Sequence, residues 1–300
     1  MYQAQRLFKS EFLPLRGLNY HVQVWGQPGA DRMPLVLLHG WMDVAASYQF
    51  VVDALGADHW VIAPDWRGFG QTMVPDADHF VFADYLGDLD FLLDYYAPDQ
   101  AVNLVGHSMG GNVAMLYAGV RPQRVRRLIN LEGFGMPRTV AAQAPARYGR
   151  WLDELKSLHQ GQREMRSYAS LDEVARRLIK TNPRLAPDKA QWLAAHWARQ
   201  TAPGQWQIQG HAAHRIASAQ LYRVDETLEV FKHISAPTLC VQALQSNIHQ
   251  LWKGSYTLDE FHQRLQAVPT LERAEIADAG HMLHHDQPAQ VAALIERFIA

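Results

Sequence analysis

Residues 102–119 read VNLVGHSMGGNVAMLYAG and place Ser108 between two segments of different periodicity. The apolar run Val102–Val105 is typical of a strand buried on both faces, and Met109–Gly119 carries apolar residues at the three- and four-residue spacing of a helix. A serine at the apex of so sharp a turn needs small neighbours, and glycines occupy positions 106, 110 and 111. The pattern predicts a strand, a tight turn that exposes the Ser108 hydroxyl, and a helix. The alternative is a glycine-rich packing turn with an incidental serine.

A hydroxyl in this position can act as a nucleophile if an imidazole removes its proton. The segment Ala279-Gly280-His281-Met282 follows the last predicted strand and precedes the closing helix. Because an imidazole titrates near neutrality without special tuning, His281 is the candidate general base. The helix that begins after Ser108 directs its N-terminus and the Met109 amide toward the reacting centre, where they can stabilise an oxyanion.

Short apolar runs alternate with amphipathic stretches along most of the chain, which predicts an α/β fold with a mostly parallel central sheet flanked by helices. The residues around Leu7–Phe12 and Tyr20–Trp25 alternate less cleanly and are expected to form an antiparallel hairpin. The expected strands of the sheet are Leu35–Leu38, Trp60–Ala63, Val102–Val105, Arg127–Leu131, Thr238–Val241 and Glu272–Ile276. The expected helices are Phe82–Tyr95, Met109–Gly119 and Ala289–Ile299.

The pattern changes between about Pro137 and Phe231, where only helices are expected. Four tryptophans are spread through this stretch, and three prolines punctuate it: Trp151, Trp192, Trp197, Trp206, Pro183, Pro187 and Pro203. We therefore predict an inserted helical cap at residues 137–231, with the core formed by residues 1–136 and 232–300. The tryptophans fit the core of such a cap, and an aromatic-lined cleft beside it would suit an apolar ligand.

Composition and charge exclude several classes of protein. With 48% hydrophobic and 19% charged residues, the 300-residue chain is neither disordered nor fibrous. The net charge of -2, without long runs of one sign, gives no footprint for nucleic acid or a membrane surface, so a small-molecule substrate is the expected partner. The single cysteine, Cys240, excludes an intramolecular disulfide, and residues 1–12 lack the apolar core of a signal peptide, so cytoplasmic location is expected. The oligomeric state stays open.

These motifs together resemble the α/β-hydrolase family, and the resemblance covers nearly the whole chain outside the predicted cap. The segment His39-Gly40-Trp41 follows a predicted strand at the point where the family has its second oxyanion-hole donor. The resemblance implies that the amides of Trp41 and Met109 form the oxyanion hole and that His281 is the catalytic histidine. In similar sequences the equivalent of His39 braces its loop. Asp65 and Arg67 are expected to be turn and ion-pair residues.

The position of the acid departs from the common pattern of the family. Most relatives have an aspartate after the strand equivalent to Thr238–Val241, but residues 242–247 read QALQSN and contain no carboxylate. Glu132, directly after Arg127–Leu131, is the substitute that we predict, because haloalkane dehalogenases of this fold carry their acid at the equivalent point. The order serine, acid, histidine is then preserved. The alternatives are that Glu132 pairs with an arginine of the cap, or that Asp225 or Asp259 is the acid; Asp278 lies too close to His281 in sequence.

The nucleophile determines the expected reaction. Dehalogenases and epoxide hydrolases of this fold use an aspartate, so Ser108 favours acyl transfer and the cleavage of a carboxylic ester. A hydrolase of carbon–carbon bonds in ring-cleavage products and a catalytically silent ligand-binding module stay open as alternatives. No cofactor is implied. His284 and His285 lack acidic or thiolate neighbours at suitable spacing, so no metal site is predicted.

Overall fold

The computed structural model describes residues 2–29, 32–56 and 58–300, and its centre is an eight-stranded sheet. The strand order is β1-β2-β4-β3-β5-β6-β10-β11. The strands are β1 (Lys9–Leu15), β2 (Leu18–Trp25), β3 (Leu35–Leu38), β4 (Val61–Pro64), β5 (Val102–His107), β6 (Val125–Leu131), β10 (Thr238–Ala243) and β11 (Leu271–Ile276). Strands β4 to β11 of this order are parallel, and β1 and β2 form the antiparallel hairpin at one edge. The predicted fold class is confirmed, and each predicted strand of the parallel part ends within two residues of its observed position.

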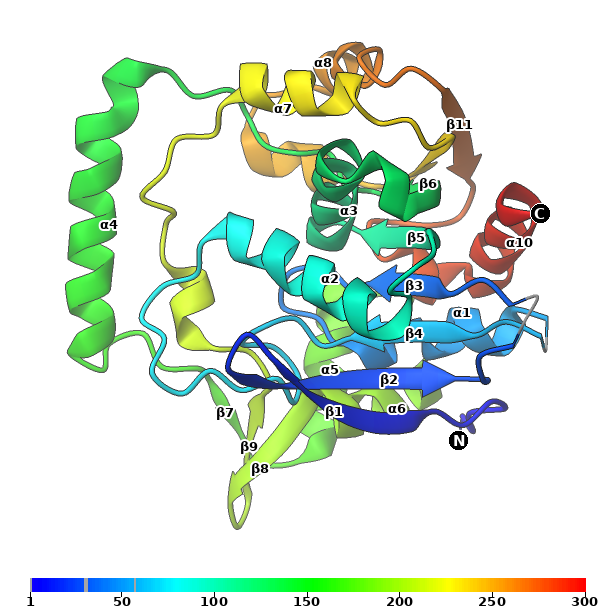
Figure 1. The fold of residues 1–300 in the computed structure, drawn as a ribbon. Coiled ribbons are helices and arrows are strands. Elements are labelled where there is room, and N and C mark those ends of the chain that lie inside the picture. Colours follow the sequence, from blue (N-terminus) through cyan, green and yellow to red (C-terminus); the bar gives the residue numbers. More distant parts are fainter. Residues whose placement is uncertain (1, 30–31, 57) are drawn as a thin grey trace.

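Helices cover both faces of the sheet (Figure 1). The longer helices of the two layers are α1 (Gln49–Ala54), α2 (Phe82–Tyr96), α3 (Met109–Val120), α7 (Val224–Lys232), α8 (Leu258–Leu265) and α10 (Pro288–Ile299). Shorter helical segments are η1 (Ala45–Tyr48), η2 (Pro122–Arg124), η3 (Ala141–Gln143), η4 (Ala212–Arg215), η5 (Ile248–Trp252) and α9 (Leu283–Asp286).

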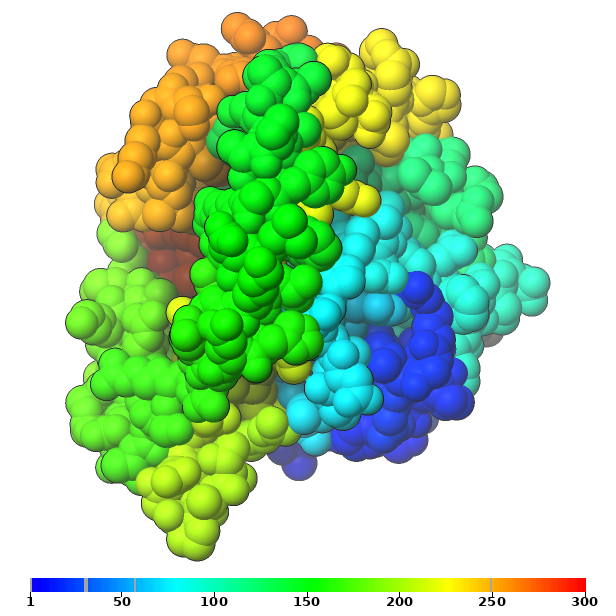
Figure 2. All heavy atoms as spheres, turned by 90° about the vertical axis from the view of Figure 1, so that its left-hand side faces the viewer, coloured from blue at the N-terminus to red at the C-terminus, as the bar shows by residue number. Residues whose placement is uncertain are grey.

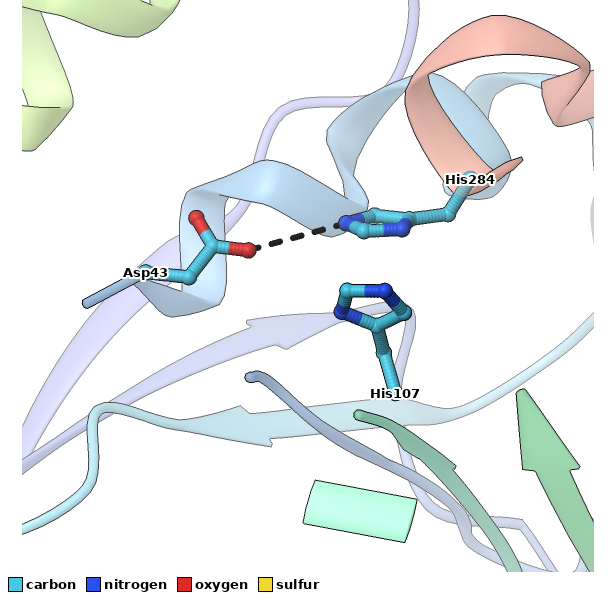
Figure 3. Close-up of side chains that lie close together, drawn as sticks. All are labelled: Asp43, His107 and His284. Carbon is cyan, nitrogen blue, oxygen red and sulfur yellow. Dashed lines mark ion pairs between the residues drawn. The ribbon is translucent and has the colours of Figure 1, made fainter. Parts of the chain in front are cut away.

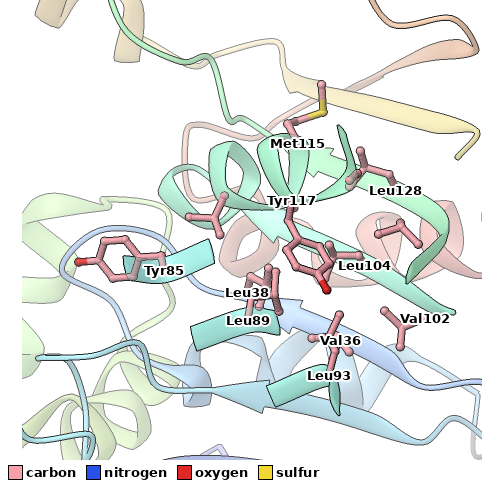
Figure 4. Close-up of a cluster of buried hydrophobic side chains, with 14 of the residues drawn as sticks. Val36, Leu38, Tyr85, Leu89, Leu93, Val102, Leu104, Met115, Tyr117 and Leu128 are labelled. Carbon is pink, nitrogen blue, oxygen red and sulfur yellow. The ribbon is translucent and has the colours of Figure 1, made fainter. Parts of the chain in front are cut away.

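The core is divided by the sheet because successive side chains of a strand point to opposite faces. In β3, Val36 and Leu38 join the cluster under α2 and α3, shown in Figure 4, whereas Leu35 and Leu37 join the cluster under α1 and α10. All four side chains are fully buried. A strand covered on both faces reads as a continuous apolar run, which is why this run indicated the sheet.

The segment 137–231 contains helices α4 (Ala144–His159), α5 (Leu171–Thr181) and α6 (Pro187–Trp197). The expectation that it holds helices only is wrong. Strands β7 (Ser167–Tyr168), β8 (Ala198–Ala202) and β9 (Gln205–Ile208) form a separate antiparallel sheet of order β7-β9-β8. Trp206 and Ile208 alternate with glutamines along β9, but this alternating run covers only four residues and is too short to stand out in the sequence.

The three helices of this segment pack differently against the core: α5 and α6 bury side chains against it, and α4 does not. Side chains of α5 and α6 share a hydrophobic cluster with Val44, Ala46 and Phe50, which lie along η1 and the start of α1. Helix α4 has no buried side chain and lies on the side toward which β3 and β5 point (Figure 1). Figure 2 views that side and shows α4 crossing it, with a hollow beside the helix that exposes part of the C-terminal segment. None of the helices within the described ranges combines the length and apolar character needed to traverse a lipid bilayer.

Candidate active site

Ser108 lies at the tip of the turn between β5 and α3 and has a strained backbone. Its φ of 51° and ψ of -114° place it outside the regions that side-chain-bearing residues favour, at a cost of about 1–3 kcal/mol. The turn is closed by the Ser108 amide, which donates to the Leu131 carbonyl at 2.8 Å, and by the Asn112 amide, which donates to the Ser108 carbonyl at 3.0 Å. The surrounding backbone therefore holds the strained serine in place.

The glycines of the turn are required by close backbone contact. A β-carbon added at Gly106 would lie 2.2 Å from the Gly110 carbonyl oxygen, and one added at Gly110 would lie 2.2 Å from the Leu38 carbonyl oxygen. Both separations are far inside van der Waals contact, so any larger residue would push β3, β5 and α3 apart. This is the physical reason for the glycine pattern around Ser108.

The loop between β11 and α9 brings His281 against the serine. The Nε2 atom of His281 lies 3.0 Å from the Ser108 Oγ, and its Nδ1 atom lies 3.2 Å from the Oε2 of Glu132. Ser108 and His281 are partly exposed, whereas Glu132 is buried. The structure thus brings together the three side chains selected from sequence, although their catalytic roles stay a prediction.

Glu132 is held by the strand end that lacks the usual acid. The Ala243 amide donates to Oε1 at 2.7 Å, and the Ser246 hydroxyl donates to Oε2. Sequence reasoning found no carboxylate in residues 242–247 but missed that this stretch supplies the donors that orient Glu132. The other two candidates lie elsewhere: Asp225 is exposed and pairs with Arg138, and Asp259 lies in the first turn of α8.

The loop after β3 packs directly on the nucleophile turn. A β-carbon added at Gly40 would lie 3.2 Å from the Cβ of Ser108 and 2.9 Å from the Nδ1 of His107, so the backbone next to Trp41 passes over the serine. Met109 begins α3, whose N-terminus points toward Ser108. The backbone next to Trp41 and the start of α3 at Met109 thus both adjoin the Ser108 turn, and the oxyanion hole made of their amides stays a prediction.

The comparison with known families agrees with this architecture. The sequence model described as the alpha/beta hydrolase fold matches residues 33–288. The chain belongs to the α/β hydrolase fold family. The resemblance inferred from the motifs of Ser108, Trp41 and His281 is thereby confirmed.

Individual relatives of this α/β hydrolase extend the comparison over the full chain. It is 23% identical over 301 residues to a serine hydrolase-like protein of Danio rerio, covering 99% of this chain and 90% of the relative. The solved thioesterase domain from the curacin biosynthetic pathway superposes with a TM-score of 0.83 at 24% identity, over 97% of this chain and 99% of that one. A novel esterase from Mycobacterium tuberculosis superposes with a TM-score of 0.71 at 19% identity, over 98% and 91%. At such identities the superpositions establish the fold alone.

Three polar residues near the site of this hydrolase have structural contacts, as predicted. The Nδ1–H of His39 donates to the Gly40 carbonyl at 2.7 Å, and its Nε2 accepts from the Trp66 amide at 2.9 Å. Burial lowers the pKa of His39, which keeps this tautomer neutral. Asp65 accepts a hydrogen bond from the Ala45 amide, and Arg67 forms two contacts of 2.6 Å with Asp88.

A buried polar cluster behind Ser108 was not foreseen from sequence. Asp43, His107 and His284 come from three distant parts of the chain and lie close together (Figure 3). Burial, together with the neighbouring imidazoles, lowers the pKa of His107 well below its ordinary value, so this ring is neutral. Its Nε2 lies 2.7 Å from the His281 carbonyl and donates to it, which braces the loop that carries the candidate base.

One hollow of the surface lies apart from the three candidate catalytic residues. A cavity of about 390 Å³ lies between the loop around Gly68–Val74 and strand β9. Its lining includes Met73, Glu164, Arg199 and His211 but none of the three residues that meet at Ser108. This cavity is therefore not the place where the nucleophile, the candidate base and the candidate acid meet.

Proposed function

We propose that this α/β hydrolase is a serine hydrolase that cleaves carboxylic esters through an acyl-enzyme on Ser108. The observation that carries the proposal is the chain of contacts from Ser108 Oγ to His281 Nε2 at 3.0 Å and from His281 Nδ1 to Glu132 Oε2 at 3.2 Å. A nucleophile, a base and an orienting acid within hydrogen-bond reach are what acyl transfer needs. The serine hydrolase-like relative of similar length is consistent with this function.

In the proposed reaction, the Ser108 oxygen forms a bond to the ester carbonyl carbon while His281 Nε2 takes the hydroxyl proton. The resulting oxyanion is stabilised by the Trp41 and Met109 amides. Collapse breaks the bond to the alcohol, which leaves with the proton from His281. Water then attacks the acyl-enzyme with His281 again as base, releasing the carboxylic acid. Glu132 keeps the Nδ1–H tautomer and stabilises the imidazolium in both steps.

The rim of the site supports an apolar acyl group as the substrate. Trp41, Met136 and Leu244 follow β3, β6 and β10, whose carboxyl ends meet at the same edge of the sheet as Ser108. Their exposed fractions are 54%, 52% and 56%. Large apolar side chains left open around a polar centre favour ligands with an apolar portion.

We further propose that residues 137–231 act as the cap of the enzyme and control entry to this rim. Helix α4 lies on the side toward which β3 and β5 point (Figure 1) and crosses that face of the molecule (Figure 2). Its side chains Tyr148 and Leu152 are about half exposed. Trp197 from the same segment donates through Nε1 to Asp43 Oδ1 at 3.2 Å, which anchors the segment close to the site.

The experiment compares wild type with Ser108→Ala, using p-nitrophenyl butyrate hydrolysis and labelling by a fluorophosphonate probe. We expect the variant to lose at least about 10³-fold in kcat and all labelling, because the nucleophile is gone. Equal turnover by the variant would refute the proposal. Failure of the wild type to label while it still binds ligands would favour a silent binding module, and preferential cleavage of a vinylogous 1,5-diketone would favour carbon–carbon hydrolysis.

A further inference from the structure

The cluster of Asp43, His107 and His284 has the properties of a ligand site rather than of a satisfied core. Their side chains are almost completely buried, with exposed fractions of 4%, 1% and 0%. Within the described part of the chain, Asp43 Oδ2, His107 Nδ1 and both ring nitrogens of His284 have no hydrogen-bond partner. Buried polar atoms are normally satisfied, because leaving one without a partner costs about 1–3 kcal/mol. Asp43 Oδ2 and His284 Nε2 form only a long ion pair of 3.6 Å with each other, beyond hydrogen-bond distance. Such a group of poorly satisfied buried atoms has room for a shared partner outside the protein chain.

The three side chains lie close enough together to share one ion. One ligand atom from each residue lies within 4.8 Å of the other two, and Asp43 Oδ2 is 3.6 Å from His284 Nε2 (Figure 3). In a tetrahedral zinc site with ligand distances near 2.1 Å, the ligand atoms lie roughly 3.4 Å apart. The widest separation in the cluster thus exceeds this value by no more than about 1.4 Å, which side-chain rotation can close.

The contacts around two of the three residues, His107 and Asp43, are those of metal ligands. His107 donates its Nε2–H to the His281 carbonyl at 2.7 Å, which leaves a lone pair on the free Nδ1. Asp43 Oδ1 accepts hydrogen bonds from the Ser47 hydroxyl and the Trp197 indole, so that Oδ2 stays available. Metal-binding histidines almost always donate their second nitrogen in this way, and binding carboxylates are oriented by further hydrogen bonds.

We propose that Asp43, His107 and His284 bind one divalent transition-metal ion of the zinc class. Two imidazoles and one carboxylate suit Zn²⁺ or Co²⁺, whereas Mg²⁺ and Ca²⁺ prefer oxygen ligands. Binding needs no electron transfer and leaves the contact from His107 to the His281 carbonyl intact.

The proposed metal site lies next to the three loops that carry the proposed catalytic groups. Asp43 lies two residues after Trp41, His107 immediately precedes Ser108, and His284 lies three residues after His281. One ion would therefore connect the loops that carry the oxyanion amide, the nucleophile and the base. This structural role rests on the proposed function, but binding of the ion does not.

The experiment titrates chelator-treated Ser108→Ala protein with Zn²⁺ by calorimetry and with Co²⁺ by visible absorption. Because this protein lacks the nucleophile, the measurement is independent of any esterase activity. We expect one tight Zn²⁺ site and the intense absorption of four-coordinate Co²⁺. Asp43→Asn and His284→Gln, introduced in the same background, should each weaken binding by at least about 10²-fold, since each removes a direct ligand.

His159→Gln is the matched control. His159 and His79 both contact Asp78 on the surface, which makes that group the obvious competing site for added metal. The proposal predicts unchanged tight binding in this variant. Tight binding that survives both Asp43→Asn and His284→Gln, that disappears in His159→Gln, or that is absent from the starting protein would overturn it. Circular dichroism and thermal melts select cluster variants that retain the fold, and Asp43→Asn preserves the shape of the side chain if His284→Gln does not fold.

Discussion

Replacing Glu132 by glutamine tests the orienting acid with almost no change in shape. The Ala243 amide donates to Oε1, so the carboxamide oxygen of Glu132→Gln must face that amide. The reverse orientation would set two donors against each other in a buried place, at a cost of about 1–3 kcal/mol. The carboxamide nitrogen then faces His281 Nδ1 and favours the tautomer that carries its proton on Nε2. This tautomer cannot accept the proton of Ser108.

The expected loss of kcat in Glu132→Gln follows from two energetic costs. Forcing the productive tautomer against the carboxamide costs about 2 kcal/mol, and loss of the charge-assisted hydrogen bond to the imidazolium costs about 2 kcal/mol more. Together they raise the barrier by about 4 kcal/mol, which corresponds to about a 10³-fold lower kcat. The assay is p-nitrophenyl butyrate hydrolysis at pH 7.5, with thermal melts to verify the fold.

Ser246→Ala is the control for this prediction. It removes one donor to Glu132 but keeps the carboxylate and its contact with His281. We expect a loss of no more than about tenfold in kcat, because a single hydrogen bond to a charged group is affected. Turnover by Glu132→Gln that matches wild type, in a folded protein, would refute the assignment of Glu132.

Two further predictions concern stability and use urea unfolding. Gly106→Ala should destabilise the protein by at least about 3 kcal/mol, because its β-carbon would overlap the Gly110 carbonyl. Gly149→Ala is the control, because in α4 the added carbon meets nothing within 4 Å, and it should be neutral or stabilising. Equal changes in the free energy of unfolding for the two variants would contradict the steric argument. His214 is stacked between Phe69 and Phe80, and burial lowers its pKa from 6.5 to about 3. The unfolded chain therefore gains a proton as the pH falls below 6.5 while the folded chain does not, so stability present above pH 6.5 is lost toward pH 3. Between pH 7 and pH 5 this group contributes about 2 kcal/mol of that loss. His214→Phe should therefore reduce the difference in the free energy of unfolding between the two pH values by about 2 kcal/mol. An unchanged pH dependence in this variant would show that His214 is protonated in the fold.

The strands and the Ser108 turn could be predicted from short sequence patterns, because each pattern reflects the surroundings of a few consecutive residues. The continuous apolar run of β3 reflects burial on both faces, and the glycines around Ser108 reflect backbone contacts that no side chain can share. The short strands β8 and β9 were missed, because a few alternating residues between helices leave too weak a period to detect.

What the sequence by itself determined is the α/β fold and the Ser108 turn, since both follow from residue types next to one another in the chain. It also singled out His281 and Glu132, but the choice of Glu132 rested on the resemblance to haloalkane dehalogenases. Only the tertiary structure decided how Glu132 is held and that Asp43, His107 and His284 meet behind the serine. The physical reason is that parallel strands bring their carboxyl ends to one edge of the sheet from distant parts of the chain. Contacts among the loops at that edge depend on side-chain packing, for which spacing along the sequence carries no signal.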